Sequence, residues 1–523
     1  MEKDLSLVAK GAGFYFAGFA VSKVLAYLYR ILVARGLGPE VFGVFSIGVS
    51  IVGILTVFAA FGLYQGIMHF VARHNALGET EQTRGVIRFA LKVQLILSIV
   101  FAIVLFFSSD WLAVTFFHNS ELTSVLQLFS ISLPFFTLTS SLMIVIIAFK
   151  KIEYKILIRN VLENIAKIGF TGILLLLGFG LFGAVVGIVL SIMVAFVLSL
   201  YFVQKKVFPI FGSGLKHCND IKEVLSYSWP LLAVGFFSIL MSSIDIIMLG
   251  HLSQAYDAGI YNVAMPTANL LSIAPFAFGS LFLPIITGLY AQKKMAEMKK
   301  MFKVVSRWIF SMIFPCLLFT VLFSTQILSV MFGDIYAPGA SAMVILAVGV
   351  FMASFFGPVS SILESTKKTK IIFFNTAVCG VLNIFLNLWL IPLFEASGNA
   401  IIGAALATTI SLMIWSLMAF IEVFVFTKLH PYSKAYIVPT FTACIAIALF
   451  FILKAVMPGI ELFVFPLNFI VLAIFGLGFL CLYSLLFVVF RGLQSDDLDI
   501  LRAVEKKTGI RINVVRNFVK RFI

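Results

Sequence analysis

The sequence predicts an all-α polytopic membrane protein with fourteen transmembrane helices, and three observations lead to this prediction. The chain of 523 residues is 61% hydrophobic and only 12% charged, with a mean hydropathy of +1.10, whereas soluble domains carry about 25% charged residues. Apolar windows of about 20 residues, the length that crosses a bilayer, recur along the chain. Lys and Arg gather in every second segment between these windows, which is typical of membrane proteins.

Fourteen apolar segments are candidate spans. They lie near residues 10–34, 40–68, 86–108, 122–149, 155–177, 180–203, 224–250, 258–288, 304–328, 340–363, 371–392, 399–426, 435–457 and 463–490. The second and eighth are long and interrupted by Gly or Pro. The first is too long for the apolar core of a signal peptide, and no small-residue cleavage site follows it, so we expect a spanning helix.

The distribution of positive charge tests this count. With the N-terminus inside, 32 of the 38 Lys and Arg residues fall in inner segments, and only Arg35 and Lys454 fall in outer ones. This split predicts a multi-pass protein of the cell (plasma) membrane with both termini cytoplasmic. The net charge of +15 then reflects topology, so no nucleic-acid partner is expected. Five scattered cysteines form no CxxC pair, so we expect neither a metal site nor a cofactor.

Two cytoplasmic segments have apolar residues at helical spacing among basic ones. The first, residues 293–307, links the eighth and ninth spans. The second is the basic tail, residues 491–523, where Ser495 precedes Asp496 and Asp497 as a candidate N-cap with acids in the first turn. We expect both segments to lie on anionic lipids at the cytoplasmic surface. Solvated basic helices are the alternative.

An internal repeat divides the chain. Its paired segments are Phe42–Ser46 with Ala258–Asn262, Phe149–Lys155 with Ser365–Lys370, and Gly183–Ser191 with Gly403–Ser411, at offsets of about 215–220 residues. The repeat predicts an N-terminal lobe of six helices at 1–222, a C-terminal lobe of six at 223–428, two appended helices at 429–490 and the tail. Because each repeat has an even number of spans, a pseudo-two-fold along the membrane normal should relate the lobes around a central cavity.

The chain resembles the polysaccharide transporter and oligosaccharide flippase family, which includes the Wzx-type flippases. The segments that carry the resemblance, in the family's order, are Ala34–Gly43, Ile244–Gly250, Gly259–Asn262, Phe332–Tyr336, Asn387–Pro392 and Gly403–Thr408. The family shares a superfamily with the MATE exporters and the lipid II flippases. The resemblance implies a MATE-like fold and a flippase that moves a polyprenyl-(pyro)phosphate-linked oligosaccharide from the inner to the outer leaflet by alternating access.

Cations inside the spans are the candidate substrate-binding residues. A charge at the bilayer centre costs about 2.5–3.5 kcal/mol on insertion scales, so such residues usually face a polar cavity or another helix. A cationic wall suits an anionic lipid phosphate, because it offers charge-assisted hydrogen bonds. The residues are Lys23, Tyr27 and Arg30 on the first span, Lys92 on the third, and Arg159 and Lys167 on the fifth.

Each of these residues also has a plainer interpretation. Arg30 and Arg159 could only extend to the headgroups, while Lys23 and Lys92 could face either the cavity or lipid. Two further stripes, Gln65, His69 and Arg73 on the second span and Arg88 with Lys92 on the third, are explained equally well by packing and the positive-inside rule.

Two acids are candidates for gating or ion coupling. Glu163 lies between Arg159 and Lys167 at successive i+4 steps, and it could simply pair with them along its own helix. Asp245 occupies the position that matches Arg30 at an offset of 215. We hypothesise that Asp245 and Arg30 pair when the outer side of the transporter is closed.

Competing functions remain open at this point. A MATE-like cation-coupled drug exporter would need a pocket for cationic drugs, which a cationic wall repels. A lipid II-type flippase is closer in chemistry. No hydrolytic triad, P-loop or HExxH motif marks an enzyme. Nothing in the sequence demands more than a monomer, and enzymes of glycan assembly are further candidate partners.

Overall fold

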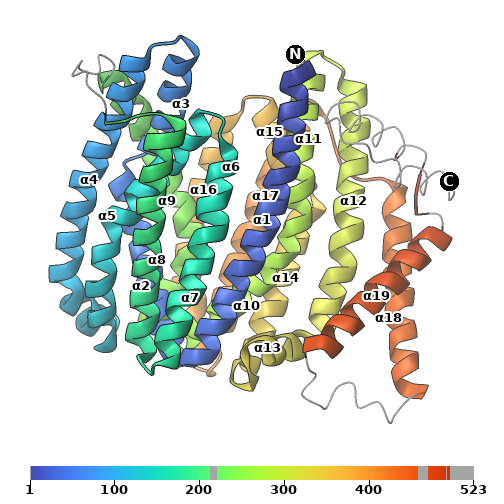
Figure 1. The fold of residues 1–523 in the computed structure, drawn as a ribbon. Helices are drawn as coiled ribbons and strands as arrows, with labels where there is room; N and C mark the ends of the chain where they lie inside the picture. The colour runs from blue at the N-terminus through green and yellow to red at the C-terminus, as the bar shows by residue number, and fades with distance from the viewer. Residues whose placement is uncertain (1, 212–220, 457–468, 491, 495–496, 498–523) are drawn as a thin grey trace. The chain divides into compact units, whose positions relative to one another are not determined.

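The described part of the protein is almost entirely helical (Figure 1). The computed structural model describes residues 2–211, 221–456, 469–490, 492–494 and 497. In chain order the helices are α1 (Glu2–Leu37), α2 (Pro39–Ala60), α3 (Leu63–Ala76), α4 (Thr80–Asp110), η1 (Trp111–Phe116), α5 (Glu121–Ala148), α6 (Ile152–Lys155), η2 (Ile156–Leu162), α7 (Glu163–Leu176), α8 (Gly180–Phe202), η3 (Val203–Val207), α9 (Ile221–Leu252), α10 (Ala255–Ala268), η4 (Asn269–Ser272), α11 (Ile273–Ala291), α12 (Met295–Leu322), α13 (Ser324–Phe332), η5 (Asp334–Gly339), α14 (Ala340–Phe355), α15 (Val359–Ser365), α16 (Thr369–Glu395), α17 (Ala400–Thr427), η6 (Lys434–Tyr436), α18 (Ile437–Val456) and α19 (Phe469–Val489).

Eleven of the helical segments in the described residues are long and apolar enough to cross a membrane. They correspond to all the expected spans except the first, fifth and thirteenth, which lie on α1, on α6–η2–α7 and on α18. The all-helical polytopic prediction is confirmed, and the count of fourteen spans stays a prediction. The chain forms two compact units, one of residues 7–259 and one that contains the described residues from Ile260 on. Helix α9 therefore belongs to the first compact unit, and the lobe bounds expected from the repeat remain a prediction.

The second and eighth spans are interrupted, as the sequence predicts. Phe61 and Gly62 between α2 and α3 have positive φ angles of 51° and 67°, and the carbonyl oxygen of Ala60 accepts a hydrogen bond from Nε2 of Gln94 at 3.2 Å. Because Gln94 is fully buried, this bond satisfies a backbone group that the break removes from the helix ladder. In the eighth span, the 3₁₀ turn η4 separates α10 from α11.

Glycines let the helices of the first unit approach closely. A Cβ atom on Gly62 would lie 2.1 Å from the carbonyl oxygen of Ser228, and one on Gly66 would lie 2.4 Å from the Ser228 hydroxyl. The small-xxx-small pattern at Gly62 and Gly66 thus packs α3 against α9. Gly43 on α2 and Gly259 on α10 contact each other's backbone in the same way.

The first residues of α12 correct one expectation. Residues 293–307 do not form a separate segment on the membrane surface, because α12 runs unbroken from Met295 into the ninth span. Its apolar side chains Met298, Phe302 and Val305 are buried in the protein. An apolar stripe at helical spacing fits protein neighbours as well as lipid, so the pattern could not separate the two.

Asp497, which follows α19 in the chain, contacts this part of α12. Arg307 and Asp497 form an ion pair whose two side chains are each 2% exposed. Nε1 of Trp308 donates a second hydrogen bond to Oδ1 of Asp497 at 2.9 Å, and the backbone N–H of Gln494 donates to Oδ2 at 2.7 Å. Asp497, expected in the first turn of a lipid-bound helix, is thus held by protein donors. The rest of the predicted tail helix lies outside the described residues.

Candidate functional site

The polar stripe predicted on the fifth span forms a compact charged cluster. Arg159 lies in η2, Glu163 begins α7, and Lys167 follows one turn later. Nη1 of Arg159 donates to Oε2 of Glu163 at 2.7 Å, and Nζ of Lys167 lies 3.6 Å from Oε1. One carboxylate therefore bridges two cations and leaves the cluster with a net charge of +1.

The three side chains differ in exposure. The Glu163 side chain is only 4% exposed, while those of Arg159 and Lys167 are 26% and 20% exposed. The buried Glu163 carboxylate is thus paired with two cations, and a buried charge requires such pairing. The cations retain accessible surface with which an anion could interact.

Aromatic rings support both cations. The Arg159 guanidinium lies 4.8 Å from the centre of the Phe136 ring on α5. Nζ of Lys167 lies 5.6 Å from the centre of the Tyr29 ring on α1. Both distances fall within the range of cation–π attraction, so the rings help to fix where the charges lie.

The backbone of the cluster is irregular. Residues Ile156–Leu162 form the π-helical segment η2, a conformation that occurs often at functional sites. Nδ2 of Asn164 donates to the carbonyl oxygen of Asn160 at 2.9 Å, and Nδ2 of Asn160 approaches the carbonyl oxygen of Gly18 at 3.5 Å. These amides satisfy backbone carbonyls in the irregular turn and connect it to α1.

Helix α1 lies beside α7 and brings the other predicted cations into the same unit (Figure 1). Leu32 contacts Gly172 and Leu175 contacts Gly36, so the two helices run in the same direction. This agrees with the predicted topology, in which the first and fifth spans cross the membrane in the same direction. On α1, Lys23 is exposed and Tyr27 and Arg30 are partly buried.

Two predicted residues lie on other helices of the unit. Lys92 is exposed on α4. Asp245 is buried on α9, with 2% of its surface exposed. Its pairing with Arg30 stays a prediction.

Residues of the stripe on α3 contact α9. His69 stacks on Tyr227 of α9, with ring centres 4.8 Å apart. Arg73 lies 3.4 Å from Glu223 in an exposed ion pair. On α4, Nε of Arg88 donates to the carbonyl oxygen of Ile210 at 2.8 Å.

The second unit contains a buried polar network that the sequence analysis missed. Nδ2 of Asn387 donates to the backbone and side-chain oxygens of Asn383 at 3.0 and 3.2 Å. Nδ2 of Asn383 and the hydroxyl of Tyr261 both donate to Oγ1 of Thr408, at 3.3 and 3.4 Å. The i+4 spacing of asparagines inside an apolar helix is the signal that could have revealed it.

A further intramembrane acid was also missed. Oε2 of Glu422 on α17 accepts a hydrogen bond from Nδ2 of Asn375 on α16 at 2.7 Å. Asn375 is fully buried, while Glu422 is partly exposed. A single acid near the inner end of a predicted span does not stand out in the sequence.

The chain is similar in sequence to known membrane proteins. It is 24% identical over 420 residues to an uncharacterized membrane protein of Methanocaldococcus jannaschii, covering 76% of this chain and 80% of that protein. It is 23% identical over 422 residues to a putative O-antigen transporter of Shigella flexneri, covering 79% of this chain and 96% of that protein.

Solved structures share the fold. The lipid II flippase MurJ in an inward closed conformation has a TM-score of 0.71 at 15% identity, covering 93% of this chain and 99% of that one. A multidrug resistance MATE family transporter in an inward-facing conformation has a TM-score of 0.64 at 15% identity, covering 78% and 94%. The fold is therefore MATE-like.

Two family models match the chain. The MatE family matches residues 230–389. The family described as "Polysaccharide biosynthesis protein" matches residues 8–289, more than half of the chain. The chain therefore belongs to the polysaccharide biosynthesis protein family and is a multi-pass membrane transporter of the superfamily that includes MATE exporters and lipid II flippases.

Proposed function

We propose that this transporter moves a polyprenyl-(pyro)phosphate-linked oligosaccharide from the inner to the outer leaflet of the plasma membrane by alternating access, with both of its termini in the cytoplasm. The observation that carries the proposal is the cluster of Arg159, Glu163 and Lys167, which has a net positive charge and two partly exposed cations inside a predicted span. The (pyro)phosphate of the substrate is the anion that such cations attract. The Shigella flexneri relative is named a putative O-antigen transporter, which fits a glycan cargo.

The cations of α1 have a supporting role in this proposal. Lys23, Tyr27 and Arg30 lie on the helix that packs beside α7, and in the proposal they add two cations and a hydroxyl for the same headgroup. Lys92 serves the same substrate from α4. Export of a headgroup with two negative charges from an inside-negative cell gains about 2.3 kcal/mol per charge per 100 mV, so no coupled cation is required.

The two acids have different roles in the proposal. Both carboxylate oxygens of Glu163 already face cations, so Glu163 holds the cluster together, and ion coupling through it would require breaking both ion pairs. Asp245 gates the outer side by pairing with Arg30. If so, reversing both charges should restore the transport that is lost when either one is reversed. Failure of this rescue would remove the gate from the proposal.

Reconstitution of the full chain into proteoliposomes tests the function. Defined polyprenyl-pyrophosphate oligosaccharides are loaded on one side, and a membrane-impermeant glycan oxidant reports their appearance on the other. Transport of these lipids, accelerated by a potential that is negative on the loaded side, is the expected result. Transport of lipid II in place of these lipids would identify the peptidoglycan precursor as the substrate. Export of cationic dyes alone would overturn the proposal.

A further inference from the structure

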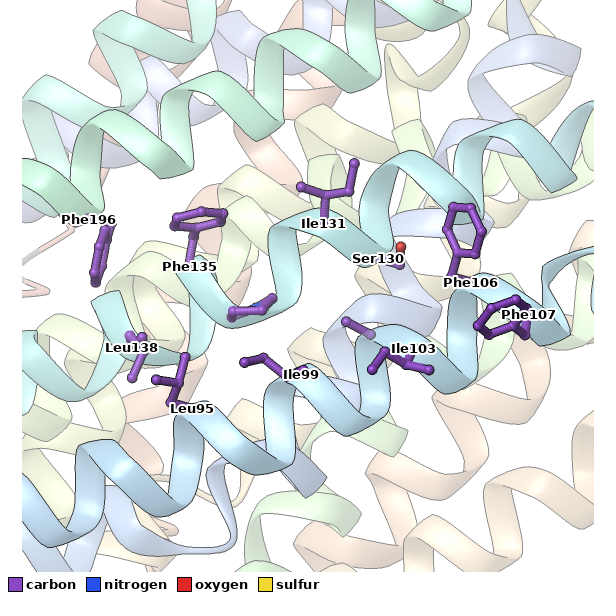
Figure 2. Close-up of a pocket in the computed structure, with 12 residues that line it drawn as sticks. Leu95, Ile99, Ile103, Phe106, Phe107, Ser130, Ile131, Phe135, Leu138 and Phe196 are labelled. Atoms are coloured by element: carbon purple, nitrogen blue, oxygen red, sulfur yellow. The ribbon is translucent and has the colours of Figure 1, made fainter.

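An apolar groove runs along the surface of the first unit between α4 and α5 (Figure 2). Its volume is about 650 Å³, and twelve residues line it. Figure 2 shows Leu95, Ile99 and Ile103 of α4 on one side and Ile131, Phe135 and Leu138 of α5 on the other. Ser130 is its one polar lining residue, and the Ser130 hydroxyl donates to the carbonyl oxygen of Gln127 at 2.6 Å. The lining thus offers an occupant apolar contact alone.

The α5 side of the groove includes Pro134. It lies inside α5 and also lines the groove. A proline inside a helix has no N–H to donate, and its ring clashes with the preceding turn, which kinks the helix. Phe196 of α8 closes one end of the groove and meets Phe135 edge-on, with ring centres 5.6 Å apart.

Lys92 lies at one end of the apolar stripe that Leu95, Ile99 and Ile103 form on α4. Lys92 precedes Leu95 by three residues, Ile99 by seven and Ile103 by eleven, so it shares their face of α4. Its side chain is exposed and makes no ion pair or hydrogen bond within the described part of the chain. The face of α4 therefore combines one cation with a long apolar surface, which is the pattern that a lipid with a phosphate head and an apolar chain would match.

The length of this apolar stripe distinguishes a polyprenyl phosphate from a phospholipid as the ligand. At 1.5 Å per residue, Lys92 and Phe106 are about 21 Å apart along the helix axis. One leaflet of the hydrocarbon core is only about 15 Å deep. A phosphate held at Lys92 would thus be followed by an apolar surface that continues past the bilayer midplane. The acyl chains of one leaflet fill only their own half of the core, whereas a long polyprenyl chain crosses the midplane.

The groove also adjoins the charged cluster. Phe135 lines the groove, and the next residue, Phe136, lies against the Arg159 guanidinium. Within one turn of α5, Phe135 thus faces the apolar groove and Phe136 faces the cationic cluster.

From these observations we infer that the groove between α4 and α5 binds the polyprenyl chain of the lipid carrier, with its phosphate at Lys92. This inference rests on the proposed function for the identity of the lipid. The site would hold the lipid as it arrives from the membrane, before its (pyro)phosphate moves on to Arg159 and Lys167.

Binding of polyprenyl monophosphate to the purified full-length protein tests the inference without any glycan or transport step. Ile103→Trp fills the groove, and Val104→Trp is the matched control, since the two side chains are 52% and 55% exposed and only the first lines the groove. We expect Ile103→Trp to weaken binding at least tenfold and Val104→Trp to change it less than twofold. Ile99→Trp, a second filling variant, should repeat the result, and thermal unfolding midpoints near that of the wild type show that the variants fold.

Lys92→Gln tests the head end of the site. It should weaken binding of polyprenyl monophosphate and leave that of uncharged polyprenol unchanged. If Ile103→Trp and Val104→Trp weakened binding of polyprenyl monophosphate equally, the inference would be overturned. It would also be overturned if dioleoyl phosphatidate competed for the site as well as polyprenyl monophosphate does, which would indicate a site for bilayer phospholipid. Because this assay measures lipid binding alone, a protein that binds polyprenyl monophosphate but fails to move the glycan would overturn the proposed function and leave the groove assigned.

Discussion

The two halves of the duplicated sequence carry a stripe of polar residues on corresponding helices, and only the first stripe is charged. In the first unit the stripe on α6, η2 and α7 consists of Lys155, Arg159, Glu163 and Lys167. In the second unit the stripe on α16, at the same i+4 steps, consists of Asn375, Cys379, Asn383 and Asn387. Both helices follow the repeated basic turns at Phe149–Lys155 and Ser365–Lys370.

The difference in exposure shows what the charges add. Asn383 and Asn387 are at most 1% exposed, and both make hydrogen bonds inside the second unit. Arg159 and Lys167 keep about a quarter and a fifth of their side-chain surface exposed. A buried neutral network packs α16, so a polar stripe at this position does not have to be charged. The proposed function assigns the charges of the first copy to an anion.

Making the cluster of Arg159, Glu163 and Lys167 neutral should have the largest effect. In the triple variant Arg159→Gln, Glu163→Gln and Lys167→Gln no charge is left without its partner, so the protein should fold. Transport of the lipid-linked glycan should fall about 100-fold or more, because two charge-assisted hydrogen bonds of about 1.5–3 kcal/mol each are lost. Proteoliposome transport and thermal unfolding measure the two properties. Wild-type transport in this variant would show that the cluster is structural.

Removing only the acid should affect stability. Glu163→Gln leaves Arg159 and Lys167 facing each other without the carboxylate between them. Loss of one partner of a buried pair costs about 3–5 kcal/mol, and the partial exposure of the cations reduces this to about 2 kcal/mol. Thermal unfolding in detergent measures the change. The double variant Glu163→Gln with Lys167→Gln should recover part of the loss, and a double variant less stable than the single one would contradict the bridging role.

The second stripe should respond in the opposite way. Asn383→Leu removes two hydrogen bonds and leaves Thr408 and Asn387 with fewer partners, which should cost about 1 kcal/mol of stability. Transport by the folded fraction should stay within about twofold of the wild type, because no charge changes. A loss of transport as deep as that of the triple variant would mean that both stripes contact the substrate.

The smallest effect concerns pH, and it arises in a loop of the second unit outside its stripe. Burial, with repulsion from Lys303 and Lys299, lowers the pKa of His430 from its ordinary value of 6.5. The unfolded chain therefore binds this proton more readily, and stability should fall slightly as the pH drops below 6.5. The unfolding midpoint at pH 7.5 and pH 5.5 measures this, and His430→Asn should reduce the difference. An unchanged pH dependence in His430→Asn would assign it to another group.

Local pattern predicted most of the fold and part of the site. Apolar windows and the positive-inside rule located the helices, and the glycines of the second span indicated that it is interrupted. The i+4 spacing of Arg159, Glu163 and Lys167 predicted their ion pairs, because that interaction lies within one helix.

Contacts between distant residues could not be predicted in this way. Phe136 and Tyr29 support the cations from other helices, and nothing in their own neighbourhood distinguishes them from the other aromatic residues of the chain. The apolar stripe at the start of α12 was assigned to lipid because its period does not reveal what covers it. Asp497 similarly looked like a first-turn acid until its partner Arg307 was located.

The pair of Arg307 and Asp497 has a consequence for how the protein is made. The two residues are 190 positions apart in the chain, and synthesis proceeds at about 5–20 residues per second. Arg307 therefore emerges about 10–40 s before its carboxylate partner, and α12 enters the membrane while its inner end still carries an uncompensated cation. A chain that stops before Asp497 has every described helix from α1 to α19 but lacks the carboxylate that pairs with Arg307 in the described part of the protein.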